Sequence, residues 1–276
     1  MGQASLRPSS ATVSQKTSQC GARCCVAWCV CCNQRPMIDI HCHLLPGIDD
    51  GPSTVEDAMA LAKALADDGI QHVVCTPHVF PGRFENRRTG ILDEFTRFQA
   101  LLAQSGIPLR ISCAGEVRLT PESLDLLPLG ELPFLGQVQG FNTMLLEMPD
   151  GQVPLGADRF VSHLIQHKIL PVIVHPERNR GVMEDPQRLA PFIHMGCPVQ
   201  VTAASLTGHF GSKAQETAQT LLDEGWVTVI ASDAHNLQGR RPRMGAARDW
   251  LHHTYGAAAA YELTVAAPAR ICGMAL

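Results

Sequence analysis

The chain has 276 residues, a formal net charge of −4, 45% hydrophobic residues and 17% charged residues. This composition is typical of a globular protein that buries a substantial core. The slightly acidic balance argues against nucleic acid or an anionic membrane surface as the main partner. The sequence also contains no apolar run of the roughly 18 residues that a membrane-spanning helix needs.

The first 36 residues differ from the rest of the chain. Residues 1–19 are rich in Ser, Thr and Gln without an apolar period, which predicts disorder. Six of the 11 cysteines precede Met37, in a run that matches no paired-cysteine zinc motif and precedes no signal-peptide cleavage site. We therefore expect 1–36 to be a dispensable Cys-rich leader, or translation to begin at Met37, and 37–276 to form the functional domain.

The other cysteines are scattered through the body of the chain, mostly within apolar runs. Scattered cysteines of this kind are typical of a reduced protein rather than of a disulfide-stabilised one. The expected location is therefore the cytoplasm. The oligomeric state is not indicated by any feature of the sequence.

From Met37 onward, short apolar runs alternate with helix-like segments. The runs are rich in Val, Ile and Leu and lack a two-residue alternation, which is typical of strands buried on both faces. The expected strands are Met37–His41, His72–Thr76, Leu109–Ala114, Thr143–Glu147, Leu170–His175, Pro198–Thr202 and Trp226–Ala231.

Capping residues and glycines mark the expected helices. Ser53-Thr54-Val55-Glu56 has the pattern of a capping box, with Ser53 as the N-cap and Glu56 reaching back to it, and Gly69 is expected to end this helix. Further helices are expected at Ile91–Leu102, Ala157–Lys168, Pro186–Met195, Lys213–Glu224 and Met244–Tyr255. Strands that alternate with helices predict an α/β fold with parallel pairing and right-handed crossovers.

Histidines and carboxylates recur where the expected strands end. The nine candidate metal ligands, five histidines and four carboxylates, are His41, His43, Asp50, His78, Glu116, Glu147, His175, Asp233 and His235. A parallel barrel gathers the carboxyl ends of its strands on one face, whereas an open sheet spreads them along a line. The pattern therefore predicts a distorted (β/α)7 TIM-like barrel with a metal site at the C-terminal ends of the strands.

The residue types indicate more than one ion. The H-x-H pair places both imidazoles on one side of an extended segment. Carboxylates can bridge two cations, and nine mixed nitrogen and oxygen ligands exceed the four of a closed zinc site, so two or three ions are expected. This mixture suits Mn, Fe or Zn. His163 and His167, although four residues apart, lie within an expected helix and are interpreted as surface or packing residues.

Two arginines favour a phosphate substrate. Arg178 directly follows the strand that ends at His175, and Arg240 lies five residues beyond His235. A planar guanidinium can clasp a phosphate through two hydrogen bonds, although a surface arginine can equally pair with a nearby carboxylate. The sequence contains neither a G-x-S-x-G nor a C-x5-R nucleophile motif. Asp233 or a metal-linked histidine is the candidate proton donor.

Several motifs, in this order, resemble those of the PHP (polymerase and histidinol phosphatase) superfamily. The motifs are M-I-D-I-H-C-H-L-L-P-G-I-D-D-G-P from residue 37, T-P-H, Gly115-Glu116 before T-P, P-V-I-V-H-P-E-R and I-A-S-D-A-H-N-x-x-G-R. They are most similar to the manganese-dependent protein-tyrosine phosphatases encoded with bacterial capsular and exopolysaccharide genes. The resemblance extends from residue 37 to about residue 272. Val79 departs from it, since many relatives have a histidine there, and the 36-residue leader has no counterpart.

The resemblance implies a seven-stranded distorted barrel with a trinuclear site, and it assigns the nine candidate ligands to Mn²⁺, with Fe, Co or Zn as other possible metals. It assigns Arg178 and Arg240 to the phosphate. The implied reaction is hydrolysis of phosphotyrosine in a protein, and the implied substrate is a bacterial tyrosine kinase of polysaccharide export, through which the enzyme regulates capsule or exopolysaccharide synthesis.

Three other readings share parts of this pattern. A PHP-type phosphatase for small molecules such as histidinol phosphate has the same ligands and differs only in substrate. An amidohydrolase-type barrel also begins with H-x-H but requires a ligating lysine in mid-barrel, where this chain has Glu116 and Glu147. A catalytically silent metal-binding regulatory module belongs to a different functional class, and the retained arginines argue against it.

Overall fold

The strands of the computed structural model, which describes residues 36–275, form two sheets. The first sheet has the parallel order β1 (Met37–Cys42), β2 (Ile70–Cys75) and β4 (Arg110–Cys113). The second has the parallel order β10 (Val229–Ala231), β9 (Val199–Thr202), β8 (Ile169–Val174), β7 (Phe141–Glu147), β5 (Glu116–Arg118) and β3 (His78–Val79). A short strand, β6 (Gly136–Val138), pairs antiparallel with β7.

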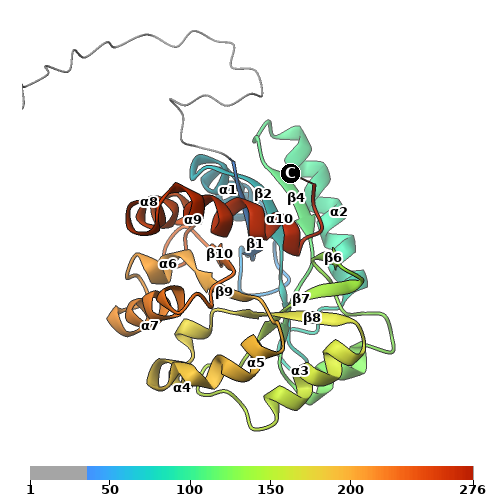
Figure 1. The fold of residues 1–276 in the computed structure, drawn as a ribbon. Helices are drawn as coiled ribbons and strands as arrows, with labels where there is room; N and C mark the ends of the chain where they lie inside the picture. The colour runs from blue at the N-terminus through green and yellow to red at the C-terminus, as the bar shows by residue number, and fades with distance from the viewer. Residues whose placement is uncertain (1–35, 276) are drawn as a thin grey trace, which may run out of the picture. The chain divides into compact units, whose positions relative to one another are not determined.

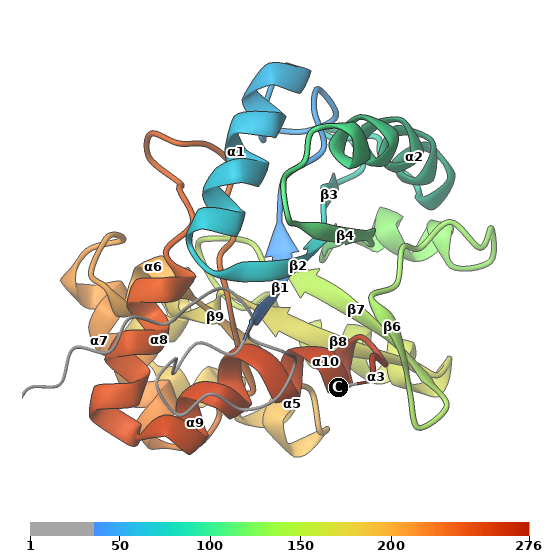
Figure 2. The ribbon, with the colours of Figure 1, turned by 90° about the horizontal axis from the view of Figure 1, so that it is seen from above.

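Two kinked strands and one pair of backbone hydrogen bonds join the sheets into a barrel. β2 continues past Pro77 as β3, and β4 continues past Gly115 as β5. On the other side, β1 meets the segment after β10, where the Asp233 amide donates to His41 (2.8 Å) and the His43 amide donates to Ala234 (2.9 Å). The seven strands predicted from the sequence therefore run around one distorted barrel, as predicted, with helices outside them (Figures 1 and 2).

Each predicted helix is present, and several short ones were not predicted. The α-helices are α1 (Val55–Asp67), α2 (Arg88–Gln104), α3 (Ala157–Gln166), α4 (Arg180–Glu184), α5 (Ala190–His194), α6 (Ala203–Leu206), α7 (Ser212–Asp223), α8 (Met244–Tyr255), α9 (Ala257–Tyr261) and α10 (Ala267–Ile271). The tighter or wider turns are η1 (Pro121–Leu126), η2 (Pro176–Arg178), η3 (Pro186–Leu189) and the π-helix η4 (Glu262–Ala266). The helix predicted at Pro186–Met195 is divided between η3 and α5.

The predicted capping box is wrong by one residue. Thr54, rather than Ser53, is the N-cap of α1, and its hydroxyl oxygen accepts from the Asp57 amide at 3.1 Å. The Thr54 hydroxyl in turn donates to the Asp57 carboxylate at 3.0 Å. Asp57 thus takes the place predicted for Glu56, because the helix begins at Val55 and its third residue is the aspartate.

The apolar residues form two clusters. The larger one lies between the strands and helices such as α1, α2 and α3. The smaller one contains residues of β1, β2, β7, β8 and β10 together with Ala269, Ile271 and Cys272, but none from α1, α2 or α3, and so fills the barrel interior. The C-terminal helix α10 therefore closes the end of the barrel opposite the carboxyl ends of the strands.

Close packing fixes the position of α10. The Thr143 hydroxyl, near the start of β7, donates to the Ile271 carbonyl at 2.6 Å. A Cβ atom on Gly136 would lie 2.2 Å from the Cys272 carbonyl oxygen, so only glycine fits there.

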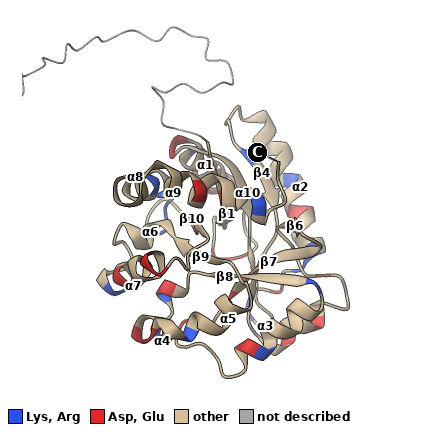
Figure 3. Cartoon of the chain, viewed as in Figure 1, with Lys and Arg blue, Asp and Glu red and all other residues tan. Residues whose placement is uncertain are grey.

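Positively and negatively charged residues are mixed on the outer helices, for example on α3 and α7 (Figure 3). Among the described residues, no helix combines the length and hydrophobicity needed to span a membrane.

The predicted leader, 1–36, lies outside the described residues apart from Pro36. The predicted domain, 37–276, coincides with the described part of the chain except for residue 276. The division at Met37 remains a prediction.

Candidate metal centre

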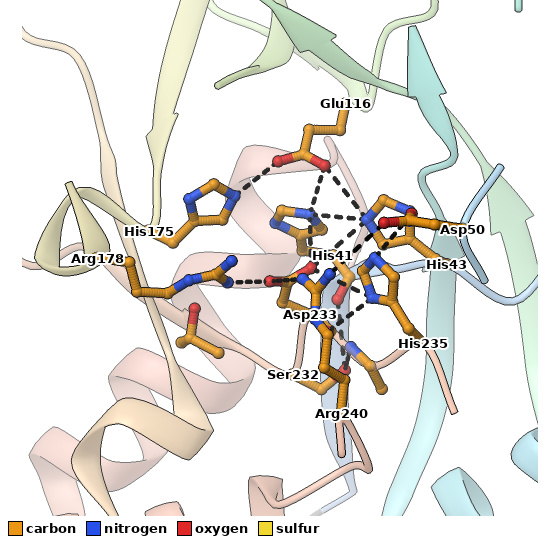
Figure 4. A network of polar contacts seen from close by, with 12 residues as sticks. His41, His43, Asp50, Glu116, His175, Arg178, Ser232, Asp233, His235 and Arg240 are labelled. Carbon is orange, nitrogen blue, oxygen red and sulfur yellow. Dashed lines mark hydrogen bonds and ion pairs between the residues drawn. The ribbon is translucent and has the colours of Figure 1, made fainter. Parts of the chain in front are cut away.

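The barrel brings the nine predicted ligands together at the carboxyl ends of its strands. His41 lies on β1, His78 on β3 and Glu116 on β5, while Glu147 is the last residue of β7. The others lie in the loops that follow β1, β8 and β10, namely His43, Asp50, His175, Asp233 and His235. Most of these side chains converge on one point above the barrel interior (Figure 4).

The donor atoms fall into four overlapping groups, and within each group the atoms lie within 4.8 Å of one another. The groups are His43, Asp50, His78 and His235; His41, His43 and Glu116; His41, His175 and Asp233; and His78, Glu116 and Glu147. All nine predicted residues occur in these groups, and four of them occur twice. Overlapping groups of this kind have room for more than one cation, with shared ligands between them.

Glu116 is the centre of the cluster. Its Oε1 atom lies 2.7 Å from Nε2 of His175, and its Oε2 atom lies 2.9 Å from Nδ1 of His78. The same Oε2 atom lies 3.3 Å from Nε2 of His41 and 3.2 Å from Nε2 of His43. The Glu116 side chain is fully buried. One carboxylate therefore faces four imidazoles, and Figure 4 shows its contacts with three of them, His41, His43 and His175.

Unpaired polar atoms support a cation in this place. Five of the nine residues have a buried nitrogen or oxygen atom without a hydrogen bond within the described chain: His78 Nδ1, Glu116 Oε2, Glu147 Oε2, Asp233 Oδ1 and His235 Nε2. A buried polar atom without a partner costs about 1–3 kcal/mol. A divalent cation bound by imidazole and carboxylate donors satisfies these atoms together, so the residues present fit a multi-metal site.

The electrostatics of the cluster also fit cation binding. Burial lowers the pKa of His175 to about 4, and burial together with the charge of His43 lowers that of His235 to about 4. Both rings are therefore neutral at pH 7 and keep a lone pair for a ligand. Burial, and then the negative charge of Glu116, raise the pKa of Glu147 to about 7. A cation bound by these residues would relieve this repulsion between the carboxylates.

A second layer of residues orients the imidazoles. Nδ1 of His43 lies 2.6 Å from Oδ2 of Asp49, and Nδ1 of His41 lies 2.8 Å from the Gln200 amide oxygen. Both acceptors bind the Nδ1 proton, so each Nε2 atom offers its lone pair to the cluster. Asp39 accepts hydrogen bonds from the backbone amides of His41 and Ser232 and from the Ser232 hydroxyl. It thereby ties the end of β1 to the end of β10.

The sequence did not assign roles to Asp39, Asp49 or Gln200. Asp39 precedes His41 by two residues and Asp49 precedes Asp50, so their places in the motifs were a usable signal. Gln200 carried no such signal, because neither a histidine nor a carboxylate directly follows the strand predicted at Pro198–Thr202.

Strained backbone accompanies two of the candidate ligands. His175 (φ 35°) and Asp233 (φ 51°) are in the left-handed region, which costs non-glycine residues of order 1–3 kcal/mol. Gly51 is required beside His43, since a Cβ atom there would lie 2.5 Å from the His43 carbonyl oxygen. The Gly51 amide donates to Asp49 at 2.9 Å, which fixes this turn.

Both predicted arginines border the cluster. Arg178 follows β8 and Arg240 lies in the loop after β10. Each guanidinium donates to Oδ2 of Asp233 (Figure 4). Their side chains are 24% and 26% exposed, so part of each side chain remains accessible to solvent. The Asp233 pKa lies well below its usual range because the positive charges of Arg240, His41 and Arg178 outweigh the effect of burial. Asp233 is therefore ionised near neutral pH, which suits its ion pairs with both arginines.

The remaining histidines lie outside the four groups. His163 and His167 are exposed on and after α3, and Nδ1 of His167 lies 2.9 Å from the His163 carbonyl oxygen. Their interpretation as surface residues agrees with this position.

Residues 37–273 match a family model described as capsular polysaccharide synthesis, CpsB/CapC. The chain belongs to the CpsB/CapC family. The resemblance found in the sequence motifs is thereby confirmed.

Curated relatives of this family are similar over most of their length. The chain is 32% identical to the tyrosine-protein phosphatase YwqE of Bacillus subtilis, over 83% of this chain and 89% of that protein. It is 31% identical to the tyrosine-protein phosphatase CpsB of Streptococcus pneumoniae, over 85% of this chain and 98% of that protein. A putative tyrosine-protein phosphatase, CapC of Staphylococcus aureus, is 28% identical over 74% of this chain and 79% of that protein.

The fold of the CpsB/CapC chain also matches a solved relative. It superimposes with a TM-score of 0.79 and 30% identity on a chain from the crystal structures of YwqE and CpsB, described as unique metal-dependent tyrosine phosphatases. The match covers 87% of this chain and 96% of that chain. The predicted barrel therefore agrees with an experimental structure of the family.

Proposed function

We propose that this CpsB/CapC chain is a metal-dependent protein-tyrosine phosphatase that hydrolyses phosphotyrosine at the nine-residue cluster. The observation that carries the proposal is the convergence of four overlapping donor groups with two part-exposed arginines at one end of the barrel. Relatives at about 30% identity are tyrosine-protein phosphatases, which supports the same substrate class for this chain.

The cluster would hold two or three divalent cations, and Mn²⁺ is the metal proposed, with Fe, Co and Zn as the other metals that suit these ligands. The proposed ligands are His41, His43, Asp50, His78, Glu116, Glu147, His175, Asp233 and His235. Bound cations supply positive charge for the phosphoryl oxygens and make a hydroxide nucleophile available near neutral pH.

The chain itself supplies orientation and charge. Arg178 and Arg240 approach the cluster from two loops and are both held by Asp233, so their guanidinium groups are positioned before a phosphate arrives. Their positive charge offsets the charge that develops on the equatorial oxygens during in-line displacement. The phenol of tyrosine leaves with a pKa of about 10, so it requires less proton assistance than an alkyl alcohol.

We further propose that the physiological substrate is a phosphotyrosine protein of polysaccharide export, namely a bacterial tyrosine kinase. The description of the family as one of capsular polysaccharide synthesis supports this partner class. Dephosphorylation of such a kinase would regulate capsule or exopolysaccharide synthesis. The functional domain is proposed to be 37–276.

Metal removal and return tests the proposed function. The chelated full-length chain is assayed with a phosphotyrosine peptide after addition of Mn²⁺, Fe²⁺, Co²⁺ or Zn²⁺, and with histidinol phosphate in parallel. Activity should disappear with chelation, return with Mn²⁺ and favour the peptide by at least about tenfold in kcat/KM. Undiminished activity in chelator contradicts the metal site, and preference for histidinol phosphate supports a small-molecule phosphatase instead.

A matched pair of variants separates the cluster from the rest of the chain. His43→Ala removes a residue of two donor groups and should reduce turnover to background, whereas His163→Ala removes an exposed histidine and should leave it unchanged. Metal binding without any turnover in the wild type would identify a regulatory module.

A further inference from the structure

Two phenylalanines border the metal cluster from different loops. The Phe84 ring is stacked on the His78 ring, with centroids 5.4 Å apart and planes inclined by 7°. The Arg178 guanidinium carbon lies 4.6 Å from the centroid of the Phe210 ring. Each phenylalanine thus contacts one polar residue of the site, and each is only partly buried, so part of its surface remains accessible.

The barrel order sets these loops nearly opposite each other. Phe84 lies in the loop after β3, and Phe210 lies in the loop between α6 and α7, after β9. Around the barrel, β1 and β10 separate these strands on one side, and β5, β7 and β8 separate them on the other. The two rings therefore approach the opening from different sides.

Hydrogen bonds hold the turn that carries Phe84. Phe80 and Phe84 exchange two backbone hydrogen bonds, of 2.8 and 3.0 Å. The Asn86 side-chain amide donates to the carbonyls of His78 (2.9 Å) and Ile48 (2.8 Å), which joins this turn to the loop before Asp49 and Asp50. The Arg83 guanidinium carbon also lies 5.0 Å from the Phe84 ring centroid, but this side chain is exposed and can move aside.

The loop that carries Phe210 is connected to Arg178 through Glu177. The buried Glu177 carboxylate accepts from the Ser205 hydroxyl at 2.7 Å and from the Thr202 amide at 3.0 Å. Backbone bonds from Gly208 to Ser205 (3.1 Å) and from His209 to Ala204 (2.9 Å) then fix the segment before Phe210. The same hydrogen-bond network therefore fixes the position of the Phe210 ring relative to the Arg178 guanidinium.

We propose that Phe210 and Phe84 contact the aromatic ring of the substrate and make the site selective for aryl phosphates over alkyl phosphates. This inference rests on the proposed function, because it assumes a phosphate bound beside Arg178. In an aryl phosphate, one oxygen atom separates the ring from the phosphorus. A phosphate bound beside Arg178 therefore places the substrate ring close to the Phe210 ring, which packs on the same guanidinium. Contacts between aromatic rings favour binding of an aryl phosphate over an alkyl phosphate without any difference in charge.

Binding of two non-hydrolysable probes tests the proposal. Inhibition constants of phenylphosphonate and inorganic phosphate are measured on the Mn²⁺-loaded full-length chain for wild type, Phe210→Leu, Phe84→Leu and Phe210→Tyr. Each Leu variant should weaken phenylphosphonate by about fivefold to tenfold and inorganic phosphate by less than about twofold. Phe210→Tyr, which keeps an aromatic ring, should bind phenylphosphonate within about twofold of wild type.

Phe141→Leu is the matched control. Phe141 is also partly buried and also has a cation over its ring, with Lys168 Nζ 4.9 Å from the centroid, but it lies at the start of β7, away from the ligand end. This variant should change neither inhibition constant.

Three outcomes overturn the inference. Equal weakening of both probes by Phe210→Leu means that Phe210 acts only by holding Arg178. Unchanged phenylphosphonate binding in both Leu variants means that neither ring contacts the aryl group. If the wild type hydrolyses no phosphotyrosine peptide with any metal, the proposed function is rejected as well. If the wild type hydrolyses the peptide but the Leu variants do not weaken phenylphosphonate more than inorganic phosphate, only the inference is rejected.

Discussion

The Nδ1 atom of His41 lies 2.8 Å from the side-chain oxygen of Gln200, so a buried amide on β9 orients an imidazole on β1. An amide oxygen only accepts, and Nδ1 therefore carries the proton while Nε2 faces the cluster. Gln200→Leu keeps the volume but removes the acceptor. It should weaken metal binding about 10-fold to 100-fold, as measured by competition with a fluorescent chelator.

The exposed Gln166→Leu on α3 is the control for Gln200→Leu, and its metal affinity should equal that of wild type. Circular dichroism of both variants checks the fold. Unaltered metal affinity in a folded Gln200→Leu protein would show that His41 needs no partner to keep its orientation.

Arg178→Ala should lower kcat/KM for a phosphotyrosine peptide about 10²-fold to 10³-fold, the range seen when a charge-stabilising donor is removed from an active site. The metal content should stay the same, because Arg178 is not among the donor groups. Arg180→Ala, two residues away and exposed, should retain wild-type kinetics. The interpretation fails if Arg178→Ala and Arg180→Ala have the same kcat/KM.

Metal affinity should increase with pH. In the metal-free protein the pKa of Glu147 is about 7, raised by burial and by Glu116, so this carboxyl holds a proton at lower pH that must leave before it binds a cation. The affinity should therefore rise by roughly tenfold per pH unit below pH 7 for this one proton. The pKa values of His41 and His43 are also raised, by the carboxylates that outweigh their burial, and extend the rise to higher pH.

Isothermal titration calorimetry at pH 7, in two buffers with different ionisation enthalpies, measures the protons released. Net release of at least about one proton is expected. An affinity that is constant between pH 6 and pH 8 would contradict the proposed protonation of the metal-free cluster.

Ile271→Ala should destabilise the domain by about 2–5 kcal/mol, because this side chain fills the barrel interior from α10. Urea denaturation of the metal-loaded protein measures the change, and kcat should stay near the wild-type value since α10 is distant from the ligand end of the strands. Leu155→Ala, at a fully exposed leucine, should change the stability by less than about 0.5 kcal/mol.

The sequence predicted the strands and the clustered ligands because both depend on short-range signals. A buried parallel strand is a run of Val, Ile and Leu, and most of the candidate ligands lie at the end of such a run or just after it. The kinks at Pro77 and Gly115 left the strand positions unchanged, although each of these two strands is divided into two segments.

What the sequence did not reveal depends on contacts between distant segments. Gln200 meets His41 across 159 positions in the sequence, and Glu177 meets Ser205 across 28 positions. The one-residue error at Thr54 has a different cause. Ser53 and Thr54 both carry a hydroxyl group, and each is followed three positions later by an acidic residue, so the sequence alone does not distinguish them as N-caps. The C-terminal helices lacked an amphipathic pattern because their residues are buried on several sides.

The position of α10 has a consequence for synthesis on the ribosome. All barrel strands and the last candidate ligand, His235, have been translated before residues 267–271 appear. Until then the interior lacks Ala269, Ile271 and Cys272, and the nascent barrel exposes an apolar cavity at its open end. The barrel interior therefore cannot be completed before the residues of α10 are available to fold onto it.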